Sequence, residues 1–160
     1  MKTENTYTTT QLVGLVLLRM IIGWHFLYEG IVKVLNPKWT SYGYLMDSKG
    51  WLQSFFQSLA ENFSLLQAVD FLNEWALLLI GLALIVGCLA RVATIGAMVL
   101  LAFYYLSHPP LIGYTFLMPS EGSYLWIDKN IVEIAALFVL YVFPTSGIVG
   151  IDRWWRRIRN

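Results

Sequence analysis

The sequence contains little charge and almost no cysteine. Only 13% of its 160 residues are Asp, Glu, Lys or Arg, whereas a soluble domain carries about 25%. The formal net charge of +1 provides no basic surface for nucleic acid. The single cysteine, Cys88, excludes an intramolecular disulfide and a metal site built from several thiolates. We therefore expect no nucleic-acid partner and no thiolate centre.

Several catalytic signatures are also missing. The sequence has no HExxH motif, no pair of histidines at metal-binding spacing and no glycine loop of the kind that holds phosphates. It has no arrangement of a serine or cysteine nucleophile either. His25 and Glu29 share one helix face, but this pair alone does not make a dedicated metal site. We predict no bound metal ion.

Long apolar segments are what the sequence has in abundance. Apolar residues make up 58% of the chain, and the mean hydropathy is +0.60. About 20 apolar residues in a helix cross the hydrocarbon core of a bilayer, and four segments are candidates, at about 11–35, 71–89, 92–107 and 131–149. We therefore predict one domain over residues 1–160, an all-α, polytopic membrane four-helix bundle. Arg19 interrupts the first run and no small-residue cleavage site follows, so we expect this helix to be retained.

Two segments between the spans have patterns of their own. In residues 51–62, helical spacing gathers five apolar side chains on one face: Trp51, Leu52, Phe55, Phe56 and Leu59. This predicts an amphipathic extramembrane helix at the membrane surface or capping the bundle, with a partner-binding surface as the alternative. Residues 108–130 contain three prolines and predict a loop that dips into the interface or folds over the bundle.

The distribution of arginine predicts the orientation. Arg91 lies between the second and third spans, and four more arginines follow the last span: Arg153, Arg156, Arg157 and Arg159. Loops rich in lysine and arginine stay on the cytoplasmic side. We therefore predict a multi-pass protein of the cell inner membrane with both termini in the cytoplasm.

The first predicted span carries ionisable residues that a bilayer makes costly. Arg19, His25, Glu29 and Lys33 lie within it, and the last three follow one another at intervals of four residues on one helix face. A charge at the bilayer centre costs about 3 kcal/mol, so such groups face protein or water and mark function by default. We expect Arg19 to pair with an acidic group or a row of carbonyls, most naturally from another helix.

Other elements bring polar residues to the same depth. With both termini inside, the outer half of the bundle also receives Glu74, His108, Asn130 and Glu133. We predict that one outward-opening pocket is lined by Glu29, Lys33, Glu74 and Glu133. His108 is expected at its rim, and the 108–130 loop is expected to lie over it. The alternative is a purely structural set of charges, because glutamates near helix N-termini meet the helix dipole and Glu29 with Lys33 makes a local pair.

Four stretches resemble the DoxX/DoxD family of small four-helix membrane proteins: LLRMIIGWHFLYEGIVKVLNP, EWALLLIGLALIVGCLARVATIGAM, YYLSHPP and DKNIVEIAALFVLYVFPTSGIVGID. The resemblance covers about residues 12–152. It is closest to the DoxD branch, the small subunit of a membrane thiosulfate:quinone oxidoreductase. Its most specific parts are Arg-x-x-x-Gly and Gly-x-x-Lys in the first span and Asp-Lys-Asn-x-x-Glu at the start of the last.

The resemblance implies a quinone-linked redox role, with a quinone held non-covalently. In such a site Glu29, Glu133 and His108 are the candidates for proton transfer, and five residues are the candidates for substrate binding: Arg19, His25, Lys33, Glu74 and Asn130. Six aromatic residues are candidates for the walls of an apolar slot: Phe26, Tyr28, Phe103, Tyr104, Tyr105 and Trp126. The expected partners are the lipid bilayer, a second redox subunit and further copies of this chain. A non-catalytic membrane adaptor, or a protein that binds a lipid or another small molecule, is the alternative.

Overall fold

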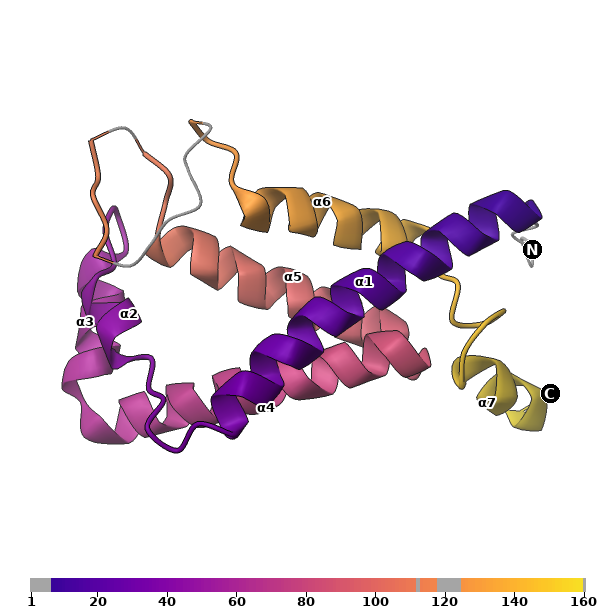
Figure 1. Ribbon diagram of the computed structural model, residues 1–160, viewed down its shortest axis with the longest axis horizontal. Coiled ribbons are helices and arrows are strands. Elements are labelled where there is room, and N and C mark those ends of the chain that lie inside the picture. The colour runs from indigo at the N-terminus through magenta and orange to yellow at the C-terminus, as the bar shows by residue number, and fades with distance from the viewer. Residues whose placement is uncertain (1–6, 112, 118–124, 160) are drawn as a thin grey trace.

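Helices make up the regular structure of the chain. The computed structural model describes residues 7–111, 113–117 and 125–159. Within them it has α1 (Thr9–Val34), α2 (Tyr42–Met46), α3 (Gln53–Glu61), α4 (Phe63–Val86), α5 (Ala90–Ser107), α6 (Lys129–Val142) and α7 (Asp152–Arg159). The long helices α1, α4, α5 and α6 lie side by side, each running opposite to the one before it (Figure 1).

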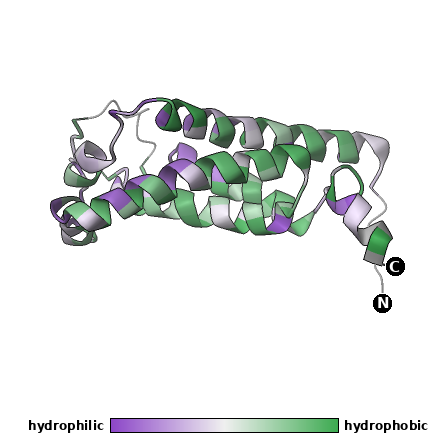
Figure 2. Cartoon of the chain, turned by 90° about the horizontal axis from the view of Figure 1, so that it is seen from below, coloured by the Kyte–Doolittle hydropathy of each residue, from purple (hydrophilic) through white to green (hydrophobic). Residues whose placement is uncertain are grey.

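The two ends of this bundle differ. The short helices α2 and α3 and the segment after α5 lie at one end, which we call the loop end (Figure 1). The start of α1 and the helix α7 lie at the other end, which we call the terminal end (Figure 1). Hydrophobic residues dominate the long helices, and hydrophilic residues gather mainly toward the loop end (Figure 2).

Three helices are long and apolar enough to cross a membrane, namely α1, α4 and α5. They confirm the first three predicted spans, with one clear shift at an end. The second span was expected to begin at about residue 71, but α4 begins at Phe63. The reason is a helix cap that the hydropathy pattern did not reveal, since the Asn62 side chain accepts hydrogen bonds from the backbone N–H groups of Ser64 and Leu65.

The predicted fourth span is shorter than expected. It was predicted to extend through residue 149, but α6 ends at Val142. Pro144 follows within two residues, and a proline cannot continue the hydrogen-bond ladder of a helix. With 14 residues, α6 rises about 21 Å, less than the roughly 30 Å of a hydrocarbon core. The described structure is therefore three membrane-length helices with a shorter fourth beside them, and a bundle of four full spans is not confirmed.

Small residues bring α1 and α4 into close contact. A Cβ atom on Gly81 would lie 2.4 Å from the backbone nitrogen of Leu27, and one on Gly30 would lie 2.6 Å from that of Leu78. These distances are shorter than any real contact, so both positions require glycine. The close approach fixes which face of α4 points inward, a stripe that contains the buried residues Leu77 and Leu84.

The predicted amphipathic segment forms α3, preceded by the short helix α2 that the pattern did not reveal. Phe56 and Ala60 of α3 pack with Leu45 of α2 in a small core of their own. Not all of the predicted apolar face is used in this way, because the Trp51 side chain is 87% exposed. The two helices and the first part of α4 thus build a cap over the loop end of the bundle.

Candidate functional site

A pocket of about 320 Å³ lies where the loop end meets the bundle. Its walls come from α1, α4, α5, the start of α6 and residues 39–44, through His25, Phe26, Glu29, Lys33, Trp39, Thr40, Ser41, Tyr44, Asn73, Leu77, Leu101, Tyr104, Lys129 and Asn130. Three of these residues, Phe26, Leu77 and Leu101, also belong to the buried core. The pocket therefore combines apolar side chains of the core with polar, charged and aromatic side chains.

The polar stripe of α1 forms one wall of the pocket. His25, Glu29 and Lys33 share a helix face because they follow one another at intervals of four residues. The Lys33 ammonium group donates to Glu29 Oε2, and its Nζ lies 5.6 Å from the centre of the Trp39 ring. The lysine is thus held between a carboxylate and an aromatic face, the two groups that stabilise an ammonium charge best in an apolar setting.

The opposite wall joins α4 to α5. Asn73 Nδ2 donates a hydrogen bond of 2.7 Å to the Tyr104 hydroxyl. Asn73 Oδ1 is buried and meets no donor among the residues that the structure describes. A buried amide oxygen without a donor costs about 1–3 kcal/mol of stability. A ligand in the pocket that donates a hydrogen bond to this oxygen would remove that cost.

The roof of the pocket is fixed by a contact to α4. Asp70 accepts hydrogen bonds from the backbone N–H of Ser41, at 2.8 Å, and from the Ser41 hydroxyl. Ser41 is buried and lines the pocket. Because both bonds end on one carboxylate, the segment over the pocket is tied to α4 at the level of Asn73 rather than left to move as a free loop.

The start of α6 completes the pocket. Asp128 caps this helix by accepting from the backbone N–H of Ile131 at 3.0 Å, and it also accepts from Asn130 Nδ2 at 2.7 Å. This cap places Lys129 and Asn130 in the pocket wall. One turn further along, Glu133 Oε1 lies 2.9 Å from His25 Nδ1 and joins α6 to α1.

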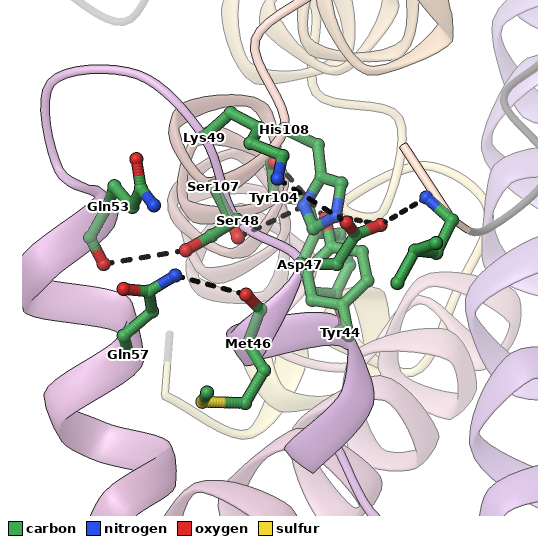
Figure 3. A network of polar contacts seen from close by, with 11 residues as sticks. Tyr44, Met46, Asp47, Ser48, Lys49, Gln53, Gln57, Tyr104, Ser107 and His108 are labelled. Carbon is green, nitrogen blue, oxygen red and sulfur yellow. Dashed lines mark hydrogen bonds and ion pairs between the residues drawn. The ribbon is translucent and has the colours of Figure 1, made fainter. Parts of the chain in front are cut away.

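A second polar cluster lies outside the pocket, between α2, α3 and the end of α5 (Figure 3). Asp47 is buried there, and its Oδ2 accepts a hydrogen bond of 2.7 Å from the backbone N–H of Leu117 and lies 3.9 Å from His108 Nε2. Lys49 Nζ lies 3.9 Å from Asp47 Oδ1. Tyr44 stacks on the histidine ring, with the ring centres 3.9 Å apart.

The titration of this cluster follows from its burial. Burial lowers the pKa of His108, an effect that Asp47 opposes and Lys49 strengthens. Burial also raises the pKa of Tyr44. Both groups are thus held toward their neutral forms. The cluster attaches the segment after α5, through Leu117, to the cap formed by α2 and α3.

Arg19 lies toward the terminal end, away from the pocket. Its Nη1 donates to the Thr145 hydroxyl at 3.1 Å and its Nη2 to the Val149 carbonyl at 2.9 Å. The side chain is 4% exposed. The expected partner from another element is present, but it is one hydroxyl and one carbonyl of the turn after α6 rather than a carboxylate or a row of carbonyls.

The structure brings together some of the predicted site residues and separates others. Four of them line the pocket: His25, Glu29, Lys33 and Asn130. Glu74 does not, because the inward stripe of α4 contains Asn73 and Leu77, and one residue further along turns a side chain by about 100°. Glu133 lines a neighbouring groove and reaches the pocket only through His25. The pocket wall therefore does not include Glu74, Glu133 or His108 as expected, and the functional roles of these three residues stay predictions.

Comparison with known families places the chain. The family model named DoxX matches residues 14–109, which is more than half of the sequence. The chain belongs to the DoxX family. Comparisons with curated proteins and with solved structures gave no match. Family membership and three apolar helices together make this DoxX chain a membrane protein in contact with the lipid bilayer.

The DoxX match covers only part of the pocket. It includes α1 to α5 and ends at Pro109, so the contributions of α1, α4 and α5 fall within the family region. Lys129, Asn130 and Glu133 of α6 lie outside it. Within the described residues no group of three or more His, Cys, Asp or Glu side chains is placed to hold a metal ion.

Sequence reasoning missed several residues of this DoxX site. Asn73 was detectable in principle, because it lies four residues before the buried Leu77 on the same helix face. Lys129 appeared only within the Asp-Lys-Asn-x-x-Glu motif and was not among the predicted site residues. Asp47 and Asp70 gave no signal, since their partners Leu117 and Ser41 lie 70 and 29 residues away along the chain. Of the predicted aromatic wall, Phe26 and Tyr104 line the pocket, whereas Tyr28, Phe103 and Trp126 are exposed.

Proposed function

We propose that this DoxX protein binds a quinone or quinol in the pocket between α1, α4, α5 and α6, as a redox-associated membrane protein similar to the DoxD branch. The pocket itself is the observation that carries the proposal. Its volume of about 320 Å³ is within the range of small-molecule sites, which are mostly apolar with a few placed polar groups. It lies among helices that face lipid, the compartment in which quinones dissolve.

The residues present fit a flat ring with oxygen atoms at its edge. Aromatic side chains from three elements surround the space: Phe26, Trp39, Tyr44 and Tyr104. Hydrogen-bond donors line it from three helices, with Lys33 on α1, Asn73 on α4, and Lys129 and Asn130 on α6. The unused acceptor Asn73 Oδ1 suits a hydroxyl, which only the reduced form of a quinone carries. A bound quinone would supply the electron chemistry, which no side chain here supplies.

The chain supplies groups that hold and move protons. His25 lines the pocket, and its Nδ1 and Glu133 Oε1 are close enough to share a proton. Histidine titrates nearest to physiological pH. Glu29 lies one helical turn along, and its side chain is 49% exposed, so it links the pocket to the surface. We propose that protons pass between the pocket and the surface through these three residues and do not cross the buried core.

Extraction of the purified protein tests this function. Mass spectrometry of the extract should detect a quinone in stoichiometric amount with the wild-type chain. Asn73→Leu should remove it, because the substitution deletes the polar centre of the α4 wall. Glu74→Leu is the matched control, with the same new side chain one position along the same helix and outside the pocket, and it should retain the quinone. A wild-type extract without quinone, or equal loss in both variants, would contradict the proposal.

A lipid-binding or adaptor role is the second candidate, and the two lysines of the pocket favour it. Lys33 and Lys129 both line the space with only Glu29 as an acid in its wall, and such a pair suits an anionic lipid headgroup. The same extraction separates the two functions. An anionic phospholipid in place of a quinone, lost in Asn73→Leu and Lys33→Gln but not in Glu74→Leu, would establish the lipid.

The orientation and the partners belong to this proposal too. We propose an inner-membrane location with both termini in the cytoplasm, supported by the position of the start of α1 and of α7 at one end of the bundle and by the arginines near that end. Labelling of single cysteines at Ser58 and Asn160 from one side of the membrane should modify only one of them. Because no side chain carries electrons, we propose a second redox subunit as electron donor, with further copies of the chain as additional partners.

A further inference from the structure

A second hollow lies directly beside the pocket, between α1 and α6. It measures about 430 Å³ and is lined by Leu18, Ile22, Ile127, Asp128, Lys129, Val132, Glu133 and Ala136. We call it the α1/α6 groove. α1 packs closely on α4 and α6 on α5, but α1 and α6 pack only loosely on each other. The groove is the space that this loose packing leaves.

The groove adjoins the pocket. Lys129 lines both, and His25 of the pocket contacts Glu133 of the groove through the pair 2.9 Å apart. The polar residues of the groove lie at the pocket side, on the first two turns of α6. The part further from the pocket is formed by aliphatic side chains, from Leu18 and Ile22 on α1 and Ala136 on α6. One end is thus polar and the other apolar.

The groove also opens to the lipid side of the bundle. Val132, which lines it, is 60% exposed. From Lys129 to Ala136 the α6 wall rises about 10 Å. The space therefore extends along α6 for about this length, is accessible from the side of the bundle, and adjoins the polar pocket.

We propose that the α1/α6 groove binds the linear hydrocarbon chain of the same molecule whose ring occupies the pocket. The ligand is then an amphiphile with an oxygen-bearing ring and an isoprenoid or alkyl chain, and it reaches the pocket sideways from the bilayer. The His25–Glu133 pair stands at the junction and separates the polar from the apolar part. This inference rests on the proposed function, because it names the route and the second half of that ligand.

Two adjacent alanines of α6 make a matched test. Ala136 lines the groove, whereas Ala135 is exposed and does not. Ala136→Phe fills the groove, and Ala135→Phe adds the same ring to the outer face of the helix. Both variants and the wild type are placed in nanodiscs of one lipid composition, so that partition of a probe into lipid is equal. The probes are two quinones with the same ring, one with a ten-carbon chain and one with a methyl group, and binding is followed by quenching of tryptophan fluorescence, with Trp39 in the pocket wall.

The hydrocarbon chain of the quinone moves from lipid into the groove, so it gains packing contacts but is not removed from water. We therefore expect only a modest increase in affinity. The wild type and Ala135→Phe should bind the long-chain quinone roughly fivefold more tightly than the methyl quinone. Ala136→Phe should lose this difference and still bind the methyl quinone normally. If all three proteins bind both probes with the same ratio, the chain site is wrong and the pocket remains. If the wild type binds neither probe, the proposed function fails and the chain site with it.

Discussion

The terminal end and the loop end of the bundle treat their polar groups in different ways. At the terminal end, Arg19 binds Thr145 and Val149, and a hollow beside it measures about 10 Å³. At the loop end, a pocket of about 320 Å³ remains open. Both ends keep buried polar atoms without a hydrogen-bond partner among the described residues, Arg19 Nε at one end and Asn73 Oδ1 and His108 Nε2 at the other, so the ends differ in the open space beside their polar groups. The comparison indicates a structural role for one end and a binding role for the other.

Packing at the terminal end should be highly sensitive to substitution. Gly87 has φ = 69°, and a Cβ atom there would lie 2.8 Å from the Cα of Gly150. We expect Gly87→Val to lower the free energy of unfolding by about 3 kcal/mol or more, because backbone strain adds to the clash. Thermal unfolding in detergent measures it. Gly14→Val is the control, since nothing lies within 4 Å of a Cβ at that position. Equal melting temperatures of the two variants would contradict the tight structural packing that we assign to the terminal end.

Removal of the buried guanidinium group should have the next largest effect. Arg19→Leu leaves the Thr145 hydroxyl and the Val149 carbonyl without their donor. We expect a loss of about 2 kcal/mol in the free energy of unfolding. Quinone binding should stay unchanged, because Arg19 does not line the pocket. Loss of binding with an unchanged melting temperature would assign Arg19 to the ligand and reverse the division between the two ends.

Removal of one charge near the pocket should affect activity and leave the fold almost unchanged. Glu133→Gln keeps the shape of the side chain but removes its ability to accept and release a proton. We therefore expect quinone-linked turnover in membranes to fall about 100-fold. The free energy of unfolding should change by about 1 kcal/mol or less, because glutamine can still accept a hydrogen bond from His25. Glu61→Gln, on the exposed end of α3, is the control. Full activity with a clearly less stable bundle would instead support the structural interpretation of these charges.

The smallest expected effect concerns pH. The pKa of His108 is lower in the folded protein than its ordinary value of 6.5, because of burial. The unfolded chain then binds more protons between the two values, so stability is complete above about pH 6.5 and is lost as the pH falls through the folded pKa, by at most about 1.4 kcal/mol per unit.

The His108 effect can be isolated by substitution. Melting temperatures of the wild type and of His108→Gln, measured in detergent between pH 8 and pH 5, should converge as the pH falls. A constant difference between the two proteins over this range would show that His108 does not titrate in the way its burial implies.

The sequence predicted the helices better than it predicted their faces. α1 and α5 followed from length and hydropathy, which depend on the local chain alone. The inward face of α4 did not, because it is decided by the contact of Gly81 and Gly30 with the neighbouring backbone. Glu74 was therefore assigned to the pocket in place of Asn73. The cluster of Asp47 and His108 depends on residues far apart in the sequence, and no local pattern could indicate it.

The early end of α6 has a consequence for the membrane around the protein. A helix of about 21 Å beside three longer ones is too short for the hydrocarbon layer. We therefore expect the turn that follows it to reach into the layer, where Arg19 would supply to the Val149 carbonyl the hydrogen bond that lipid cannot provide. On this flank hydrophobic mismatch should draw the two leaflets together, whereas the opposite flank should leave them undisturbed. The chain is then expected to concentrate in thin bilayers and to make the lipid next to α6 locally compressed.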